Sequence, residues 1–432
     1  MRFTRLIGRI GPAANPAYIN HILAGVNSVA QELDDHERQG FFGAVRLIAS
    51  WPGSNFQTQC CEIIGGLASS DLPNDLIELV GDIAAAPQGD PPDHDNDNGD
   101  EALYMLSDPK GRATYAMAQL LGPAATRSNR TELLLPAVRA IAEDPADANR
   151  TWLPTVIVRT FLSNRQAAVE IAERWVHAAT DRSLRSPELD RLAWQLLTNE
   201  AAIGAELVDR MIVSSIPEVR TRGGGLAALA SLHPNRMPNG TDPTFPGSAL
   251  RLAMNDPAAR KGVAQVLAEV VEQLPPFTDP LPHAVEAVDQ HLLINLLNDD
   301  DHDVREAAAG YPGRLTPPLY RFSDLLAATA HTRIFQEDPS TLLAALHREH
   351  ADLPETTLDL CAAWLTNNAD DAGDIRTKAA GDANYVVDMV YSIHAGAEVA
   401  SPIRRLCLDL IDRLIEAGAF DAEKKADESA AA

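Results

Sequence analysis

The chain has 432 residues, of which 45% are hydrophobic and only 5% aromatic, and its formal net charge is −25. The apolar residues are mostly Ala and Leu, a composition that favours packed helices over sheets. A charge of this sign repels nucleic-acid phosphates, so binding to DNA or RNA would need a local basic patch. The 36 Lys and Arg residues are scattered along the sequence. We therefore expect no nucleic-acid partner.

No apolar run approaches the roughly 18 residues of a transmembrane helix, and residues 1–12 lack the apolar core of a signal peptide. We expect a cytoplasmic protein with no membrane partner. The four cysteines lie in apolar helical stretches, and we interpret them as small buried hydrophobic residues that form no disulfide and bind no metal. They are Cys60, Cys61, Cys361 and Cys407.

Helical periodicity recurs along the chain, and strand patterns are almost absent. An N-terminal helical segment at 1–86 is expected to contain helices over 16–33, 38–50, 56–68 and 74–86. An acidic loop follows at 87–106. A repeat array at 107–420 is expected to contain helices over 111–121, 132–143, 151–162, 167–179, 187–198, 203–213, 217–232, 257–274, 284–297, 304–309, 340–350, 356–366, 382–393 and 402–417. The composition of residues 421–432 predicts a disordered tail.

The acidic loop contains alternating aspartates at Asp93, Asp95 and Asp97, as a calcium-binding loop would. In an EF-hand the sixth position is Gly and the twelfth is a bidentate Glu. Counting from Asp93, these positions hold Asn98 and Tyr104. We therefore expect a solvated loop that extends between repeats and holds no calcium.

The last helical pattern, 402–417, has an apolar stripe at the helical period. Ser401 stands at the N-cap position, Pro402 in the first turn, and Gly418 where a helix ends. The stripe consists of Ile403, Leu406, Cys407, Leu410, Ile411, Leu414 and Ile415.

A local pattern recurs at several helix starts, where an acidic residue, Ser or Pro is followed within three or four residues by Arg. The acid or Ser caps the helix, and the Arg can reach a carboxylate on the neighbouring repeat. Pro217 and Pro257 are 40 residues apart, which is the period of HEAT-type helix pairs. The arginines of this pattern are Arg112, Arg220, Arg260, Arg305 and Arg404.

The sequence gives no catalytic, cofactor-binding or metal-binding residue. No phosphate-binding loop with a G-x-x-x-x-G-K-[ST] pattern is present. Gly223, Gly224 and Gly225 lie in a helical pattern, so we interpret them as a close helix–helix contact or a kink. His347 and His350 are three residues apart, whereas the zinc motif of a metalloprotease helix needs four.

Four segments resemble the C-terminal helical region of large bacterial STAND-type NTPases, often described as ATP-binding or NACHT proteins. These segments are 108–113, 133–136, 373–383 and 407–419. We interpret 373–383 as a structural corner, in which Asp374 caps a short helix, Gly381 ends it and Asp382 caps the next.

The resemblance implies a HEAT-like solenoid, and in relatives with a defence role the C-terminal repeats recognise a trigger protein. The family's nucleotide site lies in an upstream module with no counterpart in this sequence. Relative to that family, this chain would be a split, truncated or repurposed solenoid. ATP binding is therefore not expected.

We predict an all-α, HEAT-like solenoid of stacked helix pairs that binds a protein partner and has no enzymatic activity. The partner would be a trigger protein or a separate P-loop ATPase or effector. One alternative is a general adaptor unrelated to defence. A second is an enzyme on a HEAT scaffold, such as a DNA glycosylase, which would need a basic concave face that the net charge of −25 disfavours.

Overall fold

The structure is a computed structural model that describes residues 2–12, 15, 18–19, 21–22, 25, 33–51, 53–69, 71–86, 108–122, 129–143, 147–238, 242–277, 288–419 and 421–431. The regular elements within these ranges are all α-helices or short 3-10 turns. The all-α class predicted from the Ala- and Leu-rich periodicity is therefore confirmed. The acidic loop at 87–106, and most of the helix expected at 16–33, lie outside the described residues.

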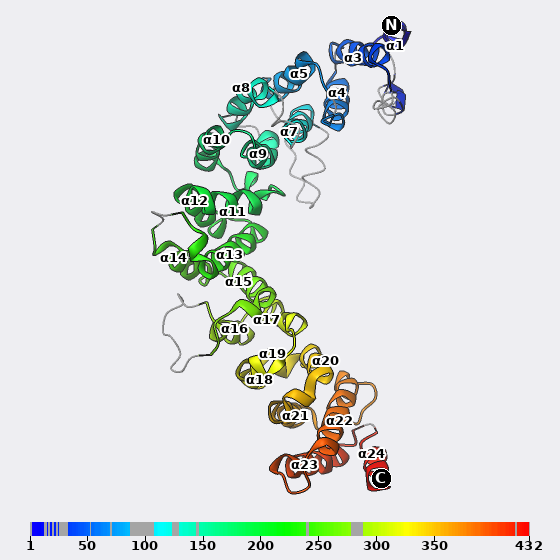
Figure 1. The fold of residues 1–432 in the computed structure, drawn as a ribbon, viewed down its shortest axis with the longest axis vertical. Helices are drawn as coiled ribbons and strands as arrows, with labels where there is room; N and C mark the ends of the chain where they lie inside the picture. Colours follow the sequence, from blue (N-terminus) through cyan, green and yellow to red (C-terminus); the bar gives the residue numbers. More distant parts are fainter. Residues whose placement is uncertain are drawn as a thin grey trace. The chain divides into compact units, whose positions relative to one another are not determined.

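Backbone contacts divide the chain into two compact units, which are considered separately (Figure 1). Unit 1 comprises Met1–Leu207, Ser214–Val219 and Met237–Thr241, and unit 2 comprises Val208–Val213, Arg220–Arg236 and Asp242–Ala432. The sequence predicted an N-terminal helical segment at 1–86 and a repeat array at 107–420, with the acidic loop between them. The helices on either side of this loop pack directly on each other.

In unit 1 the helices form two layers of antiparallel pairs (Figure 1). Helix α1 packs on α3 at the N-terminal end of the stack, and α7 packs against both α4 and α5. Helix α1 comprises Arg2–Ile10. One layer holds α3 (Asp35–Ala49), α5 (Asn74–Ala85), α8 (Arg130–Glu143), α10 (Arg165–Ala178) and α12 (Ala201–Ile212), whose last turn belongs to unit 2. The other layer holds α4 (Ser54–Gly66), α7 (Pro109–Leu120), α9 (Asp147–Thr160) and α11 (Leu189–Asn199).

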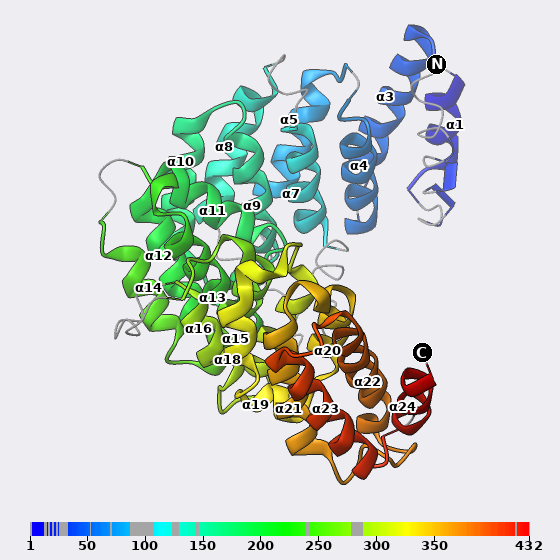
Figure 2. The same ribbon diagram turned by 60° about the horizontal axis from the view of Figure 1, so that its bottom comes forward.

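Unit 2 has the same kind of arrangement, with stacked helix pairs that Figure 2 shows from another side. One layer holds α14 (Phe245–Ala253), α16 (Gln290–Leu297), α18 (Ser323–Thr329), α21 (Pro354–Asn368) and α23 (Pro402–Glu416). The other holds α13 (Pro217–Leu232), α15 (Pro257–Glu269), α17 (His302–Ala308), α20 (Ser340–Glu349), α22 (Lys378–Gly396) and α24 (Ala422–Ala431), with the short α19 (Arg333–Glu337) beside α17 and α21. The chain is thus a HEAT-like α-solenoid of stacked helix pairs.

Side-chain caps fix the helix starts that the recurring pattern predicted. The carboxylates of Asp108 and Asp256 accept hydrogen bonds from the backbone N–H groups of Gly111 and Ala259, and the hydroxyl of Ser401 accepts one from Arg404. At α17 the cap is Asp301 and not Asp303, because Asp301 accepts from two backbone N–H groups of the first turn. Each cap satisfies donors that the helix itself leaves unpaired.

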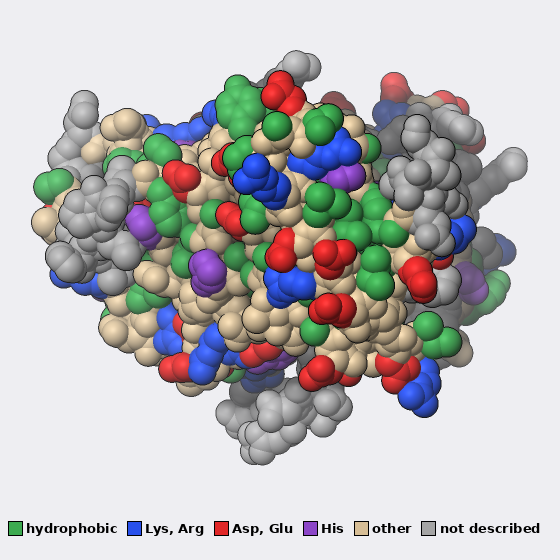
Figure 3. Space-filling view, turned by 90° about the horizontal axis from the view of Figure 1, so that it is seen from below, with side chains coloured by type: hydrophobic (Ala, Val, Ile, Leu, Met, Phe, Trp, Pro, Cys, Tyr) green, Lys and Arg blue, Asp and Glu red, His purple; other side chains and the backbone are tan. Residues whose placement is uncertain are grey.

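Three of the five arginines of the pattern join successive repeats, as expected. Arg220 donates from Nε to Asp256 at 2.9 Å, and Arg260 donates from Nε to Asp299 at 2.7 Å. Arg305, whose side chain is only 8% exposed, donates two hydrogen bonds to Glu337 at 2.7 and 3.0 Å. Asp256 accepts from Arg220 and also caps α15, the helix that carries Arg260. Arg260 in turn pairs with Asp299, so these contacts connect three successive repeats. On the face drawn in Figure 3, Lys and Arg side chains lie among Asp and Glu side chains.

The remaining two arginines behave differently. Arg112 lies 4.0 Å from Glu62, which is the limit of an ion pair. Arg404 donates to the backbone carbonyl of Ala397 at 3.4 Å, so it stabilises the loop before its own helix.

The glycine triplet lies at a close helix crossing, as predicted. A Cβ on Gly224 would overlap the carbonyl oxygen of Ala259 in α15. A Cβ on Gly262, on the opposite helix, would overlap the carbonyl of Thr221 in α13. Only residues without a Cβ allow the two backbones this close approach.

The C-terminal part departs from the sequence-based expectations in two places. The segment 421–432 was expected to be disordered, but its described residues form α24. The Tyr391 hydroxyl donates a hydrogen bond to the Ala422 carbonyl at 2.7 Å, and Lys425 forms an ion pair with Asp388. These two contacts anchor α24 to α22. The short helix expected after Asp374 is absent. Instead Thr377 caps α22, and Gly381 and Asp382 lie inside that helix.

The stripe of α23 is narrower than the sequence suggested. Cys407, Leu410, Ile411 and Leu414 are buried, whereas Leu406 is 49% exposed. A helix at the end of a stack has a neighbouring repeat on one side only, so the flank of its stripe faces solvent.

All four cysteines are buried, as expected, and their thiols are free. Burial raises the pKa of Cys60 to about 12 and that of Cys407 to about 11, because the thiolate loses its hydration. These thiols are therefore unreactive at neutral pH. Among the described helices, none is long and apolar enough to cross a membrane.

Candidate functional site

The regular pairing of helices is interrupted between α17 and α18. The chain there forms two 3-10 turns, η5 (Tyr311–Arg314) and η6 (Leu319–Phe322). Prolines at 312, 317 and 318 lack the backbone N–H that a continuing helix would need. The chain between α17 and α18 therefore forms no second long helix. We call this irregular segment, residues 311–322, the strap.

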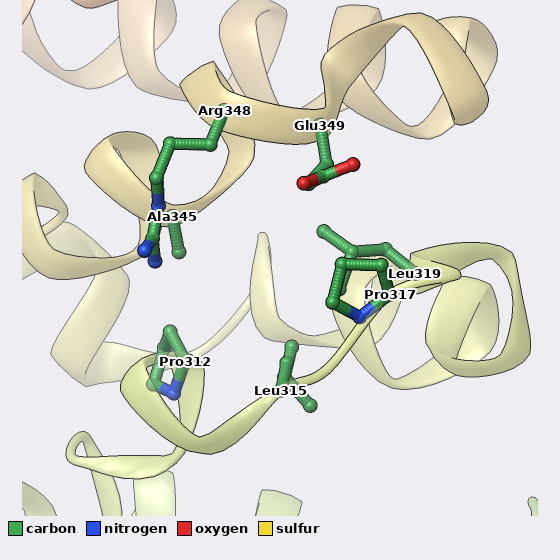
Figure 4. A pocket seen from close by; sticks show the side chains of 7 residues that line it. All are labelled: Pro312, Leu315, Pro317, Leu319, Ala345, Arg348 and Glu349. Carbon is green, nitrogen blue, oxygen red and sulfur yellow. The ribbon is translucent and has the colours of Figure 1, made fainter.

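A small pocket opens between this strap and α20 (Figure 4). Its cavity volume is about 60 Å³. Ala345, Arg348 and Glu349 of α20 face the strap residues across the pocket in Figure 4. We call it the proline pocket, and its lining residues are Pro312, Leu315, Pro317, Leu319, Ala345, Arg348 and Glu349.

Buried residues of the strap hold the proline pocket in place. Tyr311 is 1% exposed, and its hydroxyl lies 2.8 Å from the hydroxyl of Thr329 in α18. Burial raises the pKa of Tyr311 well above its usual range, so this phenol stays neutral. Leu319 and Phe322 are 3% and 5% exposed, so both ends of the strap are packed into the core of unit 2.

Two residues that line the proline pocket are charged, and an exposed aromatic residue lies next to a lining residue in the sequence. Arg348 and Glu349 project from α20, and Tyr320, next to the lining residue Leu319, is 60% exposed. Arg314 and Arg321 are exposed on the strap itself. Within the described part of the chain, no hydrogen bond or ion pair engages the side chains of these arginines or of Glu349.

Two other surface pockets have different linings. One, of about 230 Å³, lies between α5 and α8 and includes Glu78 and Asp82. The other, of about 400 Å³, lies between the ends of α21 and α23 and includes Asp370, Arg413 and Glu416. Both are more open to solvent than the proline pocket, and three of the six residues of the larger one are charged. The proline pocket is thus the most enclosed of the three.

The structure explains the histidines that the sequence singled out. His350 contacts the hydroxyl of Ser392 through Nε2 at 2.8 Å, and His347 lies 3.4 Å from Asp388. His347 lies in α20 and His350 in the following 3-10 turn η7 (His350–Asp352), and both contacts lead to α22, so they are structural links between repeats. No group of three or more potential metal ligands occurs in the described ranges.

Sequence reasoning missed the proline pocket entirely, because the helical period is absent from the strap. One signal was present. Residues 310–323 contain three prolines, two tyrosines and two arginines but no acidic residue, in a chain with 61 Asp and Glu residues. This segment therefore carries positive charge and no negative charge, unlike the acidic chain as a whole.

Comparisons with known proteins find similar solved structures but no similar sequence family. No protein-family profile matches the chain, and no curated protein matches it. Two crystal structures of importin beta are similar in fold, with TM-scores of 0.41 and 0.39 and identities of 10% and 13%. They cover 98% and 92% of this chain, which spans 60% and 54% of theirs. An engineered protein matches at a TM-score of 0.27 and 14% identity over 98% of this chain and 93% of its own. All three TM-scores are below 0.5, so the fold assignment rests on the helix pairs described above.

Proposed function

We propose that this chain is a protein-binding scaffold without catalytic activity, and that the proline pocket is one of its binding sites. A single observation carries the proposal. The pocket at the strap is the most enclosed of the three surface pockets, it is lined by five apolar residues, and the exposed Tyr320 follows one of them in the sequence. Open apolar pockets with a few polar groups on the rim are the usual form of a recognition site.

The size of the proline pocket indicates what it accepts. Its volume of about 60 Å³ is well below the roughly 150 Å³ that holds a benzene ring. It therefore suits one aliphatic side chain of a partner. Tyr320 and the charged rim would contact the residues that flank this anchor.

Site-specific photocrosslinking tests the proposal. A photoreactive amino acid at Tyr320 should yield a discrete product with a partner protein in cells of the native host. The matched control is Val399, which is 85% exposed and apolar but lies in the loop before α23. Identical products at both positions, or none at Tyr320, would overturn the assignment of the pocket.

A narrower proposal is that the chain is the recognition arm of a STAND-type defence system and works with a separate P-loop ATPase or a trigger protein. The resemblance of the segments 108–113, 133–136, 373–383 and 407–419 supports it. An adjacent ATPase or nuclease gene would favour this proposal over a general adaptor. Calorimetry on the purified chain should detect no ATP binding, and a micromolar affinity would refute the absence of a nucleotide site.

The alternative of a DNA-processing enzyme has its own test. At low salt, a glycosylase-like protein should bind duplex DNA through its basic residues. We expect no binding, because the formal net charge is −25.

A further inference from the structure

The proline pocket differs in charge from the rest of the chain. Three arginines, Arg314, Arg321 and Arg348, accompany a single glutamate, Glu349, on the pocket and its strap. The chain as a whole has 36 basic and 61 acidic residues. The strap is thus locally positive on a strongly negative protein, whereas the lining of the pocket holds one positive and one negative side chain.

The arginines lie close enough to the pocket to act on a ligand there. Arg348 lines it, Arg314 immediately precedes the lining residue Leu315, and Arg321 follows Leu319 by two residues. Consecutive Cα atoms are about 3.8 Å apart, so these backbone positions fall within about 8 Å of lining residues. An arginine side chain is long enough to span this distance, and at about a Debye length its charge is only partly screened by physiological salt.

These arginines are also free to pair with a ligand. Other arginines of unit 2 form ion pairs with a carboxylate of the next repeat, as Arg260 does with Asp299 and Arg305 with Glu337. Within the described residues, the side chains of Arg314, Arg321 and Arg348 form no ion pair or hydrogen bond. A guanidinium without a carboxylate partner binds a carboxylate of another molecule through two parallel hydrogen bonds.

We propose that the proline pocket binds a short acidic segment of a partner protein, in which one aliphatic side chain enters the cavity and neighbouring Asp or Glu residues pair with the arginines. This inference rests on the proposed function and adds the chemistry of the partner. Tyr320 packs against the aliphatic part of the segment. Glu349 repels an acidic residue on its own side, so it fixes the direction in which the segment lies.

Selection from a phage-displayed library of random 12-residue peptides on the full chain tests the inference. Enriched peptides should share one Leu, Ile, Val or Met flanked by Asp or Glu. A labelled representative should then bind in fluorescence anisotropy, and replacing its aliphatic anchor by Ala should weaken binding at least tenfold.

Two variants of the chain connect binding to the pocket. Ala345→Leu places an isobutyl group in the cavity, and Arg348→Glu reverses the charge on an exposed rim position. Each should weaken the peptide at least tenfold. The control is Arg405→Glu on α23, which changes the net charge equally at an exposed site outside the pocket and should alter affinity less than twofold. Circular dichroism checks that Ala345→Leu folds, and the exposed Arg348→Glu provides the test if it does not.

The outcomes separate the two proposals. Enrichment of basic peptides that still depend on Ala345 and Arg348 would overturn the acidic partner and leave the pocket as a binding site. Selected peptides that are insensitive to both variants, or no enrichment at all, would overturn both the inference and the assignment of the pocket.

Discussion

The guanidinium of Arg260 donates two hydrogen bonds to the carboxylate of Asp299, which lies 39 residues further along the chain, at 2.7 and 3.0 Å. The side chains are only 20% and 10% exposed. The carboxylate of Asp299 also accepts the backbone N–H of Asp301, so it shapes the turn before α17. One residue pair thus joins two repeats and fixes the start of the next helix.

Replacing Arg260 by Gln should lower the free energy of unfolding by about 2–4 kcal/mol, because it leaves the charge of Asp299 largely buried without its partner. Urea unfolding followed by circular dichroism measures the loss. The control is Arg333→Gln, whose partner Asp300 is 98% exposed. That exposed pair should contribute less than about 1 kcal/mol. Equal effects of the two variants would show that burial does not govern these pairs.

Gly262→Ala should lower the melting temperature clearly, because the new Cβ would overlap the backbone of Thr221 in α13. The overlap outweighs the gain of about 1 kcal/mol that Ala normally brings to a helix. Gly381→Ala is the matched control, since a Cβ there meets nothing within 4 Å inside α22. It should raise the melting temperature. A stabilising Gly262→Ala would mean that α13 and α15 are further apart.

Leu410→Asp should cost roughly 3–5 kcal/mol, since it creates a cavity and buries a charge at a position that is 3% exposed. Leu408→Asp makes the same chemical change two residues earlier, where the side chain is 48% exposed, and should cost under about 1 kcal/mol. In a stack of repeats the damage stays local. Hydrogen exchange should rise in α22 to α24 only, and deprotection of the whole chain would indicate a single cooperative globule.

Tyr391→Phe should loosen α24 and leave the rest of unit 2 intact. The substitution removes the hydrogen bond to the Ala422 carbonyl, which is worth about 1 kcal/mol, and keeps the ring. Hydrogen exchange of residues 422–431 should accelerate severalfold. Tyr320→Phe, at an exposed tyrosine of the strap, is the control and should leave this exchange unchanged. If α24 exchanges equally fast in the parent and in both variants, the helix is not anchored by Tyr391.

The pair of Arg46 and Asp75, which links α3 to α5, should respond to acid. Its hydrogen bond holds the pKa of Asp75 below the usual range. The stabilisation is therefore fully present above the unfolded-state pKa of about 3.9 and is lost as the pH falls through the lower folded-state pKa.

Thermal unfolding of Asp75→Asn and its parent over a pH series checks this. The parent should melt higher at pH 5 to 7, and the gap should close well below pH 4. Asp359→Asn, at an exposed carboxylate of α21, should match the parent throughout. A gap at Asp75 that persists unchanged at pH 3 would contradict the assigned pair.

The sequence determined the helices, their caps and the links between repeats. Apolar residues at the 3.6-residue period must be buried on one face, and the acid-Pro-Arg starts supply both a cap and a bridge, so local chemistry predicts α13, α15 and α23 closely. The close crossing at Gly224 was also predictable, because three consecutive glycines in a helix need a tertiary reason.

Only the tertiary structure decided the other features. The helix α24 contains few apolar residues and forms because Tyr391 and Asp388 of another helix anchor it. Asp382 lies inside α22 and not at its start, because the hydroxyl of Thr377 caps that helix first. The proline pocket depends on where an irregular strap lies against α20, and residues with no common period come together there. Periodicity describes what one helix buries, whereas a pocket is formed by segments that are distant in the sequence.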